Sequence, residues 1–150
     1  MSPHLLLLAA ALGVADRPVF VVVTRQAGLS DFRNIQGGPE KTHIVEVMGG
    51  GAAFLDYDRD GNLDILLISG TPERRFARGG PVGSLYRGDG KGKFQDVTAK
   101  SGLAVNGWGM GVAVADYDND GWDDLYITGY HRNFLFRNTG KGTFEDKAEA

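Results

Sequence analysis

One acidic nine-residue pattern occurs twice in this chain and limits its possible folds more than any other feature. It reads D-x-D-x-D-G-x-x-D over residues 56–64 and again over residues 116–124. Glycine at position 6 lets the backbone bend sharply, so the carboxylates at positions 1, 3, 5 and 9 can turn toward one point. A single Asp-Gly pair is also a common solvated turn, but two matched copies of the whole pattern favour a binding site. The carboxylates are Asp56, Asp58, Asp60 and Asp64 in the first loop and Asp116, Asp118, Asp120 and Asp124 in the second.

The residue types in these loops indicate an all-oxygen metal site. The backbone carbonyl at position 7, which belongs to Asn62 in the first loop and to Trp122 in the second, can add a ligand. Such a set suits Ca²⁺ before Mg²⁺, because Ca²⁺ accepts more ligands with looser geometry. Neither loop contains Cys or His, which argues against zinc. Two unit charges 4 Å apart repel by about 1 kcal/mol in water and about 4 kcal/mol near a protein surface. We therefore expect two structural Ca²⁺ ions to hold these loops.

The residues around the loops predict strands rather than helices. An EF-hand shares the first half of the pattern, but it needs Glu at position 12 and two flanking helices. Position 12 is Leu67 in one copy and Ile127 in the other. Short apolar runs near glycines flank each loop and are typical of buried strands. They cover residues 52–55, 65–68, 112–115 and 125–128, so each loop is expected to join two strands.

A longer unit repeats around the loops. Residues 85–96 and 135–146 each predict a β-hairpin with a glycine-rich turn. A V-T-x-x-[AS]-G-L linker follows the first hairpin at residues 97–103 and also occurs at residues 23–29. Four strands per repeat are typical of a β-propeller blade. We expect an all-β fold of about two blades of four antiparallel strands, with an orphan outer strand over residues 20–24. This would be an incomplete propeller, to which the missing part of a longer chain adds further blades.

The repeats divide the sequence into four expected parts. They are a signal peptide over residues 1–15, an outer strand and irregular segment over 16–48, a first blade over 49–103, and a second blade, truncated at its end, over 104–150. Gly13 and Ala15 stand where a secretory cleavage site needs small residues, although an N-terminal buried helix is the alternative. The apolar run before them is too short to span a membrane. We therefore expect a secreted, periplasmic or cell-surface protein without a transmembrane segment. In the first blade, the connection 71–83 is expected to be a surface insertion.

Composition argues against several other classes of protein. The net charge is −3, and nine of the fourteen Asp residues lie in the two acidic loops. The basic residues are scattered, so no nucleic-acid surface is expected. The three His residues are dispersed and the paired carboxylates serve as cation ligands, which leaves no free general acid and base. We therefore expect no enzymatic activity in this stretch.

With the loops, hairpins and linkers, the glycine-rich runs 48–51 and 109–114 resemble the FG-GAP/VCBS repeats. The best-known members are the calcium-binding blades of integrin α-subunits, and the narrower likeness is to the ASPIC/UnbV and cartilage acidic protein group. The resemblance implies a secreted or surface-exposed, seven-bladed propeller. It also implies that the eight loop aspartates and the carbonyls of Asn62 and Trp122 bind two Ca²⁺ ions. Members of the family mostly serve adhesion, ligand binding or extracellular scaffolding.

Three functional hypotheses follow. The leading one is a calcium-binding extracellular propeller region with a structural or adhesive role, whose partner is a protein or a carbohydrate. The alternatives are part of a secreted polysaccharide- or lipid-processing enzyme and a plain spacer domain. Two further features have competing interpretations. The tripeptide Arg87-Gly88-Asp89 could be adhesive or simply form a turn, and Trp122 could stack on a sugar or pack at the rim.

Overall fold

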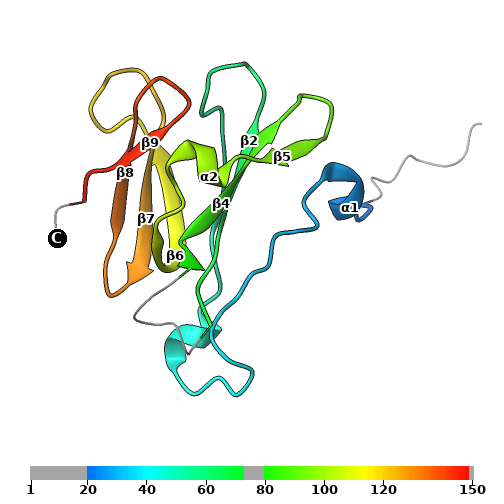
Figure 1. The fold of residues 1–150 in the computed structure, drawn as a ribbon, viewed down its shortest axis with the longest axis vertical. Coiled ribbons are helices and arrows are strands. Elements are labelled where there is room, and N and C mark those ends of the chain that lie inside the picture. Colours follow the sequence, from blue (N-terminus) through cyan, green and yellow to red (C-terminus); the bar gives the residue numbers. More distant parts are fainter. Residues whose placement is uncertain (1–19, 73–79, 149–150) are drawn as a thin grey trace, which may run out of the picture.

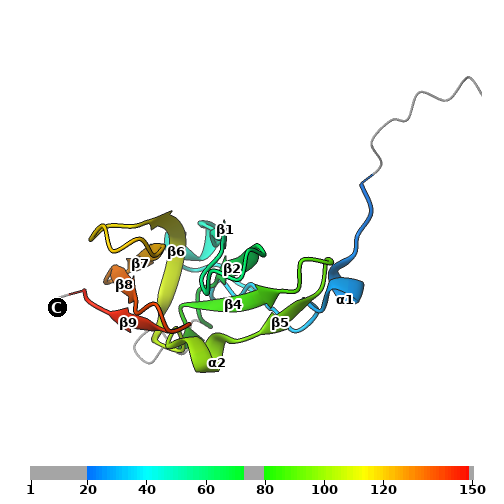
Figure 2. The same cartoon turned by 90° about the horizontal axis from the view of Figure 1, so that it is seen from above.

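Two curled antiparallel sheets, which we call blade 1 and blade 2, stand side by side (Figure 1, Figure 2). The computed structural model describes residues 20–72 and 80–148. Blade 1 has the strand order β1 (Ala52–Leu55), β2 (Asp64–Ile68), β4 (Gly83–Gly88) and β5 (Phe94–Asp96). Blade 2 has the order β3 (Gly80–Pro81), β6 (Asn106–Ala115), β7 (Asp124–Tyr130), β8 (Phe134–Asn138) and β9 (Phe144–Asp146). The prediction of an all-β fold built from propeller-like blades is confirmed.

Both kinds of predicted hairpin are present in each blade. The acidic loops close β1 onto β2 and β6 onto β7, with Leu55 opposite Asp64 and Ala115 opposite Asp124. The glycine-rich turns close β4 onto β5 and β8 onto β9. Each acidic loop therefore joins two neighbouring strands, as predicted.

The two sheets share one hydrophobic core. In β2 every second residue is buried, which directs Leu66 and Ile68 to one face of the strand. These side chains belong to the same buried cluster as Ile127, Phe134 and Phe136 of blade 2. The full cluster comprises Leu55, Tyr57, Leu66, Ile68, Val82, Leu85, Leu103, Leu125, Ile127, Phe134, Phe136 and Phe144. Burial between the sheets thus holds the two blades together.

Each V-T-x-x-[AS]-G-L linker forms a single helical turn that ends at a left-handed glycine. These turns are α1 (Thr24–Ala27) and α2 (Thr98–Ser101), followed by Gly28 and Gly102 with φ of 85° and 83°. A Cβ on Gly28 would lie 2.5 Å from the carbonyl oxygen of Phe94, and one on Gly102 would lie 2.3 Å from that of Phe144. The glycines therefore let the backbone of each linker approach the outer strand of a blade, α1 against β5 and α2 against β9.

Three details differ from the sequence prediction. The outer strand expected over residues 20–24 is not formed, because Thr24 begins α1 and residues 20–23 pair with no described strand. A strand needs a neighbour to satisfy its backbone groups, and none of the described strands pairs with residues 20–23. The long connection in blade 1 contains β3, which pairs with β6 and so extends the second sheet. The irregular segment before blade 1 contains a short 3-10 helix, η2 (Ile44–Val47).

The expected signal peptide lies outside the described residues. Among the residues that the structure does describe, no helix has the length and apolar character needed to cross a lipid bilayer.

Candidate metal centre

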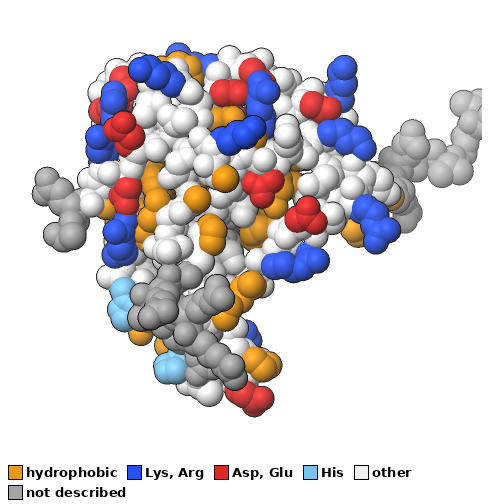
Figure 3. Space-filling view, in the orientation of Figure 1, with side chains coloured by type: hydrophobic (Ala, Val, Ile, Leu, Met, Phe, Trp, Pro, Cys, Tyr) orange, Lys and Arg blue, Asp and Glu red, His pale blue; other side chains and the backbone are white. Residues whose placement is uncertain are grey.

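The two acidic loops lie at the same end of the sheets, beside the turns of the β4–β5 and β8–β9 hairpins (Figure 1). Acidic and basic side chains are interspersed on this end of the surface (Figure 3). The first loop follows β1 and the second follows β6, so both occupy the same place in their blades. Sheet pairing, and not only sequence spacing, therefore brings other residues of each blade next to its loop.

The first half of each loop is organised by its own carboxylates. Asp56 accepts hydrogen bonds from the N–H groups of Asp60 and Gly61, each at 3.0 Å. In the second loop, Asp116 accepts them from Asp120 at 3.1 Å and Gly121 at 2.8 Å. Both loops turn through left-handed residues at positions 4 and 6. The two copies therefore have the same backbone scaffold.

The last aspartate of each loop is buried and anchors the loop to its sheet. Asp64 is 0% exposed and accepts hydrogen bonds from Tyr57 N–H at 3.0 Å and Gly88 N–H at 2.8 Å. Burial raises the pKa of the Asp64 carboxyl, although these two N–H groups act in the opposite direction. Asp124 is 1% exposed and makes the matching bonds to Tyr117 and Asn138. Each of these carboxylates therefore joins the loop to the neighbouring hairpin.

An arginine from the outer hairpin pairs with two carboxylates of each loop. Arg87 lies 2.6 Å from Asp58 Oδ2 and 2.5 Å from Asp60 Oδ2. Arg137 pairs in the same way with Asp118 and Asp120, at 2.5 and 2.6 Å. The hydrogen bond from Arg137 is the main cause that holds the pKa of Asp118 below its usual value. The sequence prediction missed both arginines, although their equivalent places in the two hairpins were a signal.

Three carboxylates in each loop are close enough to hold one cation. Asp56, Asp58 and Asp64 each offer one carboxylate oxygen, and these three oxygens lie within 4.8 Å of one another. The same holds for Asp116, Asp118 and Asp120. Asp58 Oδ1 is buried and has no hydrogen-bond partner among the described residues. A buried carboxylate oxygen without a partner is costly, and a hard cation would satisfy it. The ligand set therefore fits Ca²⁺ chemistry.

Two of the eight predicted carboxylates, Asp60 and Asp124, do not belong to these clusters, so the two loops bring together different positions of the motif. In the first loop, Asp60 receives the Asn62 N–H at 2.8 Å in addition to its arginine. That backbone hydrogen bond is the main cause that lowers the pKa of Asp60. In the second loop, Asp120 receives the Trp122 N–H at 3.0 Å, and both oxygens of Asp124 accept backbone N–H groups. Asn62 and Trp122 thus sit at the loop bend.

Family comparison agrees with the placement of these loops. The model of the FG-GAP-like repeat matches residues 56–127 and again residues 116–150, together more than half of the chain. The chain belongs to the FG-GAP-like repeat family. Each match begins at the first aspartate of an acidic loop. No curated protein matches the chain. The FG-GAP repeat is a non-catalytic repeat fold, which agrees with the expectation of a non-enzymatic stretch.

The two FG-GAP loops touch each other through Arg59 and Trp122. The guanidinium carbon of Arg59 lies 4.7 Å from the centre of the Trp122 ring, within the range of a cation–π contact. A Cβ on Gly140 would lie 2.9 Å from Trp122 Nε1, so the indole also packs on the β8–β9 turn. These contacts favour rim packing of Trp122 over the alternative of a sugar-stacking platform.

The Arg87-Gly88-Asp89 tripeptide of the first FG-GAP repeat is used inside the protein. Arg87 pairs with the acidic loop, and Gly88 donates its N–H to Asp64. Asp89 Oδ1 accepts hydrogen bonds from Lys91 N–H at 2.7 Å and Lys93 N–H at 2.9 Å, which shapes the hairpin turn. The contacts therefore support the turn interpretation of this tripeptide.

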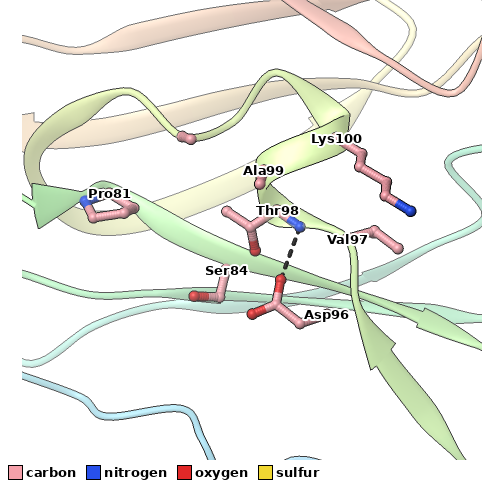
Figure 4. A pocket seen from close by; sticks show the side chains of 8 residues that line it. Pro81, Ser84, Asp96, Val97, Thr98, Ala99 and Lys100 are labelled. Carbon is pink, nitrogen blue, oxygen red and sulfur yellow. Dashed lines mark hydrogen bonds between the residues drawn. The ribbon is translucent and has the colours of Figure 1, made fainter.

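A pocket of about 400 Å³ lies between β4 and α2 of the first FG-GAP blade (Figure 4). Asp96 and Thr98 line it, and Asp96 Oδ1 accepts the Thr98 N–H at 2.8 Å. This bond satisfies a free N–H at the start of the one-turn helix. None of the acidic-loop residues lines the pocket, so it is separate from the candidate metal centre.

Proposed function

We propose that each acidic loop binds one Ca²⁺ ion and that the two ions stabilise a non-catalytic propeller region. The observation that carries the proposal is the convergence of three carboxylates in each loop, within 4.8 Å of one another. The buried, unpartnered Oδ1 of Asp58 supports it for the first loop. Arg87 and Arg137 offset part of the repulsion among these groups, and without a bound ion the rest of it opposes the loop conformation. The ion would therefore act as a clamp between the strands that each loop joins.

The proposed setting is outside the cell. FG-GAP repeats are typical of extracellular or surface proteins, and extracellular modules can use weak calcium sites with Kd on the order of 0.1–1 mM. The narrower relationship to VCBS repeats and the ASPIC/UnbV group belongs to this proposal. The role of the region would be to present a stable blade surface to a protein or carbohydrate ligand.

Calorimetry on the 150-residue chain, with Ca²⁺ or with a chelator, tests the calcium proposal. At a hundredfold excess over Kd, one bound ion adds about 2.7 kcal/mol of stability, which corresponds to a rise in Tm of roughly 5–10 °C. Mg²⁺ is expected to raise Tm less, because it demands stricter geometry. An unchanged Tm between Ca²⁺ and chelator would refute the proposal.

A matched pair of variants assigns the effect to the loops. The double variant Asp58→Asn with Asp118→Asn removes one carboxylate charge from each cluster and is expected to abolish the rise in Tm. The control is Asp123→Asn, which changes a neighbouring aspartate outside positions 1, 3, 5 and 9 and is expected to keep the rise. Equal loss of the Ca²⁺ effect in both would point to a general charge effect rather than to a site.

A further inference from the structure

One buried amide side chain crosses from blade 2 to the acidic loop of blade 1. Asn138, at the end of β8, is 0% exposed. Its Nδ2 donates hydrogen bonds to the carbonyl oxygen of Tyr57 at 2.9 Å and to that of Asp123 at 3.2 Å. Its Oδ1 accepts the Gly140 N–H at 3.0 Å. Since Tyr57 belongs to the first acidic loop and Asp123 to the second, this one side chain bonds to both loops.

The same residue also completes a chain of hydrogen bonds between the two anchoring aspartates. Asp64 accepts the N–H of Tyr57 at 3.0 Å, and the carbonyl of Tyr57 accepts Asn138 Nδ2. The N–H of Asn138 then donates to Asp124 Oδ1 at 2.7 Å. All four residues are buried, with Tyr57 the most exposed at 6%. Away from water, each of these hydrogen bonds depends on the others, because a buried polar group without a partner is costly.

Blade 1 has Gly88 where blade 2 has Asn138. The comparison separates the role of the backbone N–H, which anchors an aspartate, from that of the amide side chain, which contacts the other blade. The N–H of Gly88 holds Asp64 at 2.8 Å without any side chain. An amide side chain is therefore not needed to anchor the last aspartate of a loop. A Cβ on Gly88 would lie 2.2 Å from the carbonyl oxygen of Leu63, so blade 1 has no room for such a side chain. The side chain of Asn138 thus serves the contact between blades.

We propose that Asn138 is a positioning residue that couples the two cation loops, so that an ion in the first loop raises the affinity of the second. This inference rests on the proposed function. An ion held by Asp56, Asp58 and Asp64 orders the loop and, with it, the Tyr57 carbonyl. That carbonyl orders Asn138, whose N–H holds Asp124. Asp124 in turn accepts the N–H of Tyr117, which lies between the cluster residues Asp116 and Asp118. The second ion then binds a site that is already ordered, which is a source of positive cooperativity.

Backbone amide NMR of the full chain during a Ca²⁺ titration gives a separate readout from each loop. The N–H groups of Asp120 and Gly121 donate to Asp116 within the second loop, so their signals report the ion of that loop. The affinity of the second loop is compared between the unaltered chain and a variant with Asp56→Asn and Asp58→Asn, which disables the first loop. We expect that affinity to fall by roughly 5- to 150-fold, the usual range of coupling between sites.

The role of Asn138 is tested by repeating the comparison in Asn138→Ala. Disabling the first loop is then expected to leave the affinity of the second loop unchanged, within about twofold. Asn138→Gly, which places the residue of blade 1 at this position, should behave in the same way. The control is Asn133→Ala, because Asn133 bonds to Tyr126 in the same blade and contacts neither loop through a hydrogen bond. It should keep the full dependence.

Two results would overturn the inference while leaving ion binding intact. One is an affinity of the second loop that does not depend on the first loop in the unaltered chain, a comparison that needs no change at Asn138. The other is a dependence that persists in both Asn138 variants, which would make Asn138 a purely structural residue. If neither loop bound Ca²⁺, the proposed function itself would be refuted, and the coupling with it.

Discussion

At the scale of single residues, one arginine from the outer hairpin of each blade offsets part of the negative charge of the acidic loop. Arg87 and Arg137 each bridge the carboxylates at positions 3 and 5 of their loop. A divalent ion bound to the same carboxylates would meet this positive charge at short range. The guanidinium groups are partly exposed, with side-chain exposures of 45% and 35%, so solvent weakens the effect. We therefore expect each arginine to stabilise the loop without an ion and to weaken the binding of an ion to it.

The variants Arg87→Gln and Arg137→Gln are expected to bind Ca²⁺ more tightly. Removing a surface charge pair changes an interaction by up to about 1 kcal/mol, which corresponds to roughly fivefold in Kd. With a chelator present, the same variants should be less stable by a similar amount. Isothermal titration and melting curves measure the two effects. Arg132→Gln is the control, because Arg132 pairs with Asp146 outside both loops. Unchanged or weaker Ca²⁺ affinity in the loop variants would contradict the idea of competition.

At the scale of elements, each linker turn docks on the outer strand of the blade that follows it in the chain. The same motif places α1 on the outer strand of blade 1 and α2 on the outer strand of blade 2. Each linker turn needs a glycine for two reasons: its φ is positive, and its Cα lies close to a backbone oxygen of the outer strand. The motif was found as a repeat in the sequence, but its docking depends on a strand that lies far away in the chain. Only the folded chain shows that contact.

Gly102→Ala is expected to destabilise the chain by at least about 2 kcal/mol. The change forces an alanine into a left-handed conformation, and its Cβ would lie 2.3 Å from the Phe144 oxygen. Urea unfolding followed by circular dichroism measures the loss. The matched control is Gly80→Ala in β3, where a Cβ would meet no atom of the described residues within 4 Å, and its effect should stay within about 0.5 kcal/mol. If the two variants lost equal stability, docking of the linker would not explain the need for glycine.

At the scale of the whole molecule, the two blades bury a common core. Leu66 of blade 1 is 0% exposed and belongs to the same cluster as the aromatic residues Phe134 and Phe136 of blade 2. We therefore expect loss of packing in one blade to weaken the other.

Leu66→Ala is expected to lower the free energy of unfolding by about 2–5 kcal/mol and to speed amide hydrogen exchange in β7 as well as in β2. Exchange followed by NMR or mass spectrometry resolves the two blades. Leu63→Ala is the like-for-like control, because Leu63 is 63% exposed and should change little. Faster exchange confined to blade 1 would show that the blades open independently.

The sequence alone determined the four hairpins and the acidic loops, but it wrongly placed a strand over residues 20–24 and did not show β3. Those features depend on local spacing, such as the alternation of β2 and the placement of Asp56, Asp58 and Asp64 around a bend at Gly61. The tertiary structure decided which groups face the loops. Arg87 and Asn138 reach them through sheet pairing and blade packing, and residues 20–23 form no strand because no described strand lies beside them. The physical reason is that spacing along a chain sets local geometry, whereas a contact between distant segments exists only once both are packed.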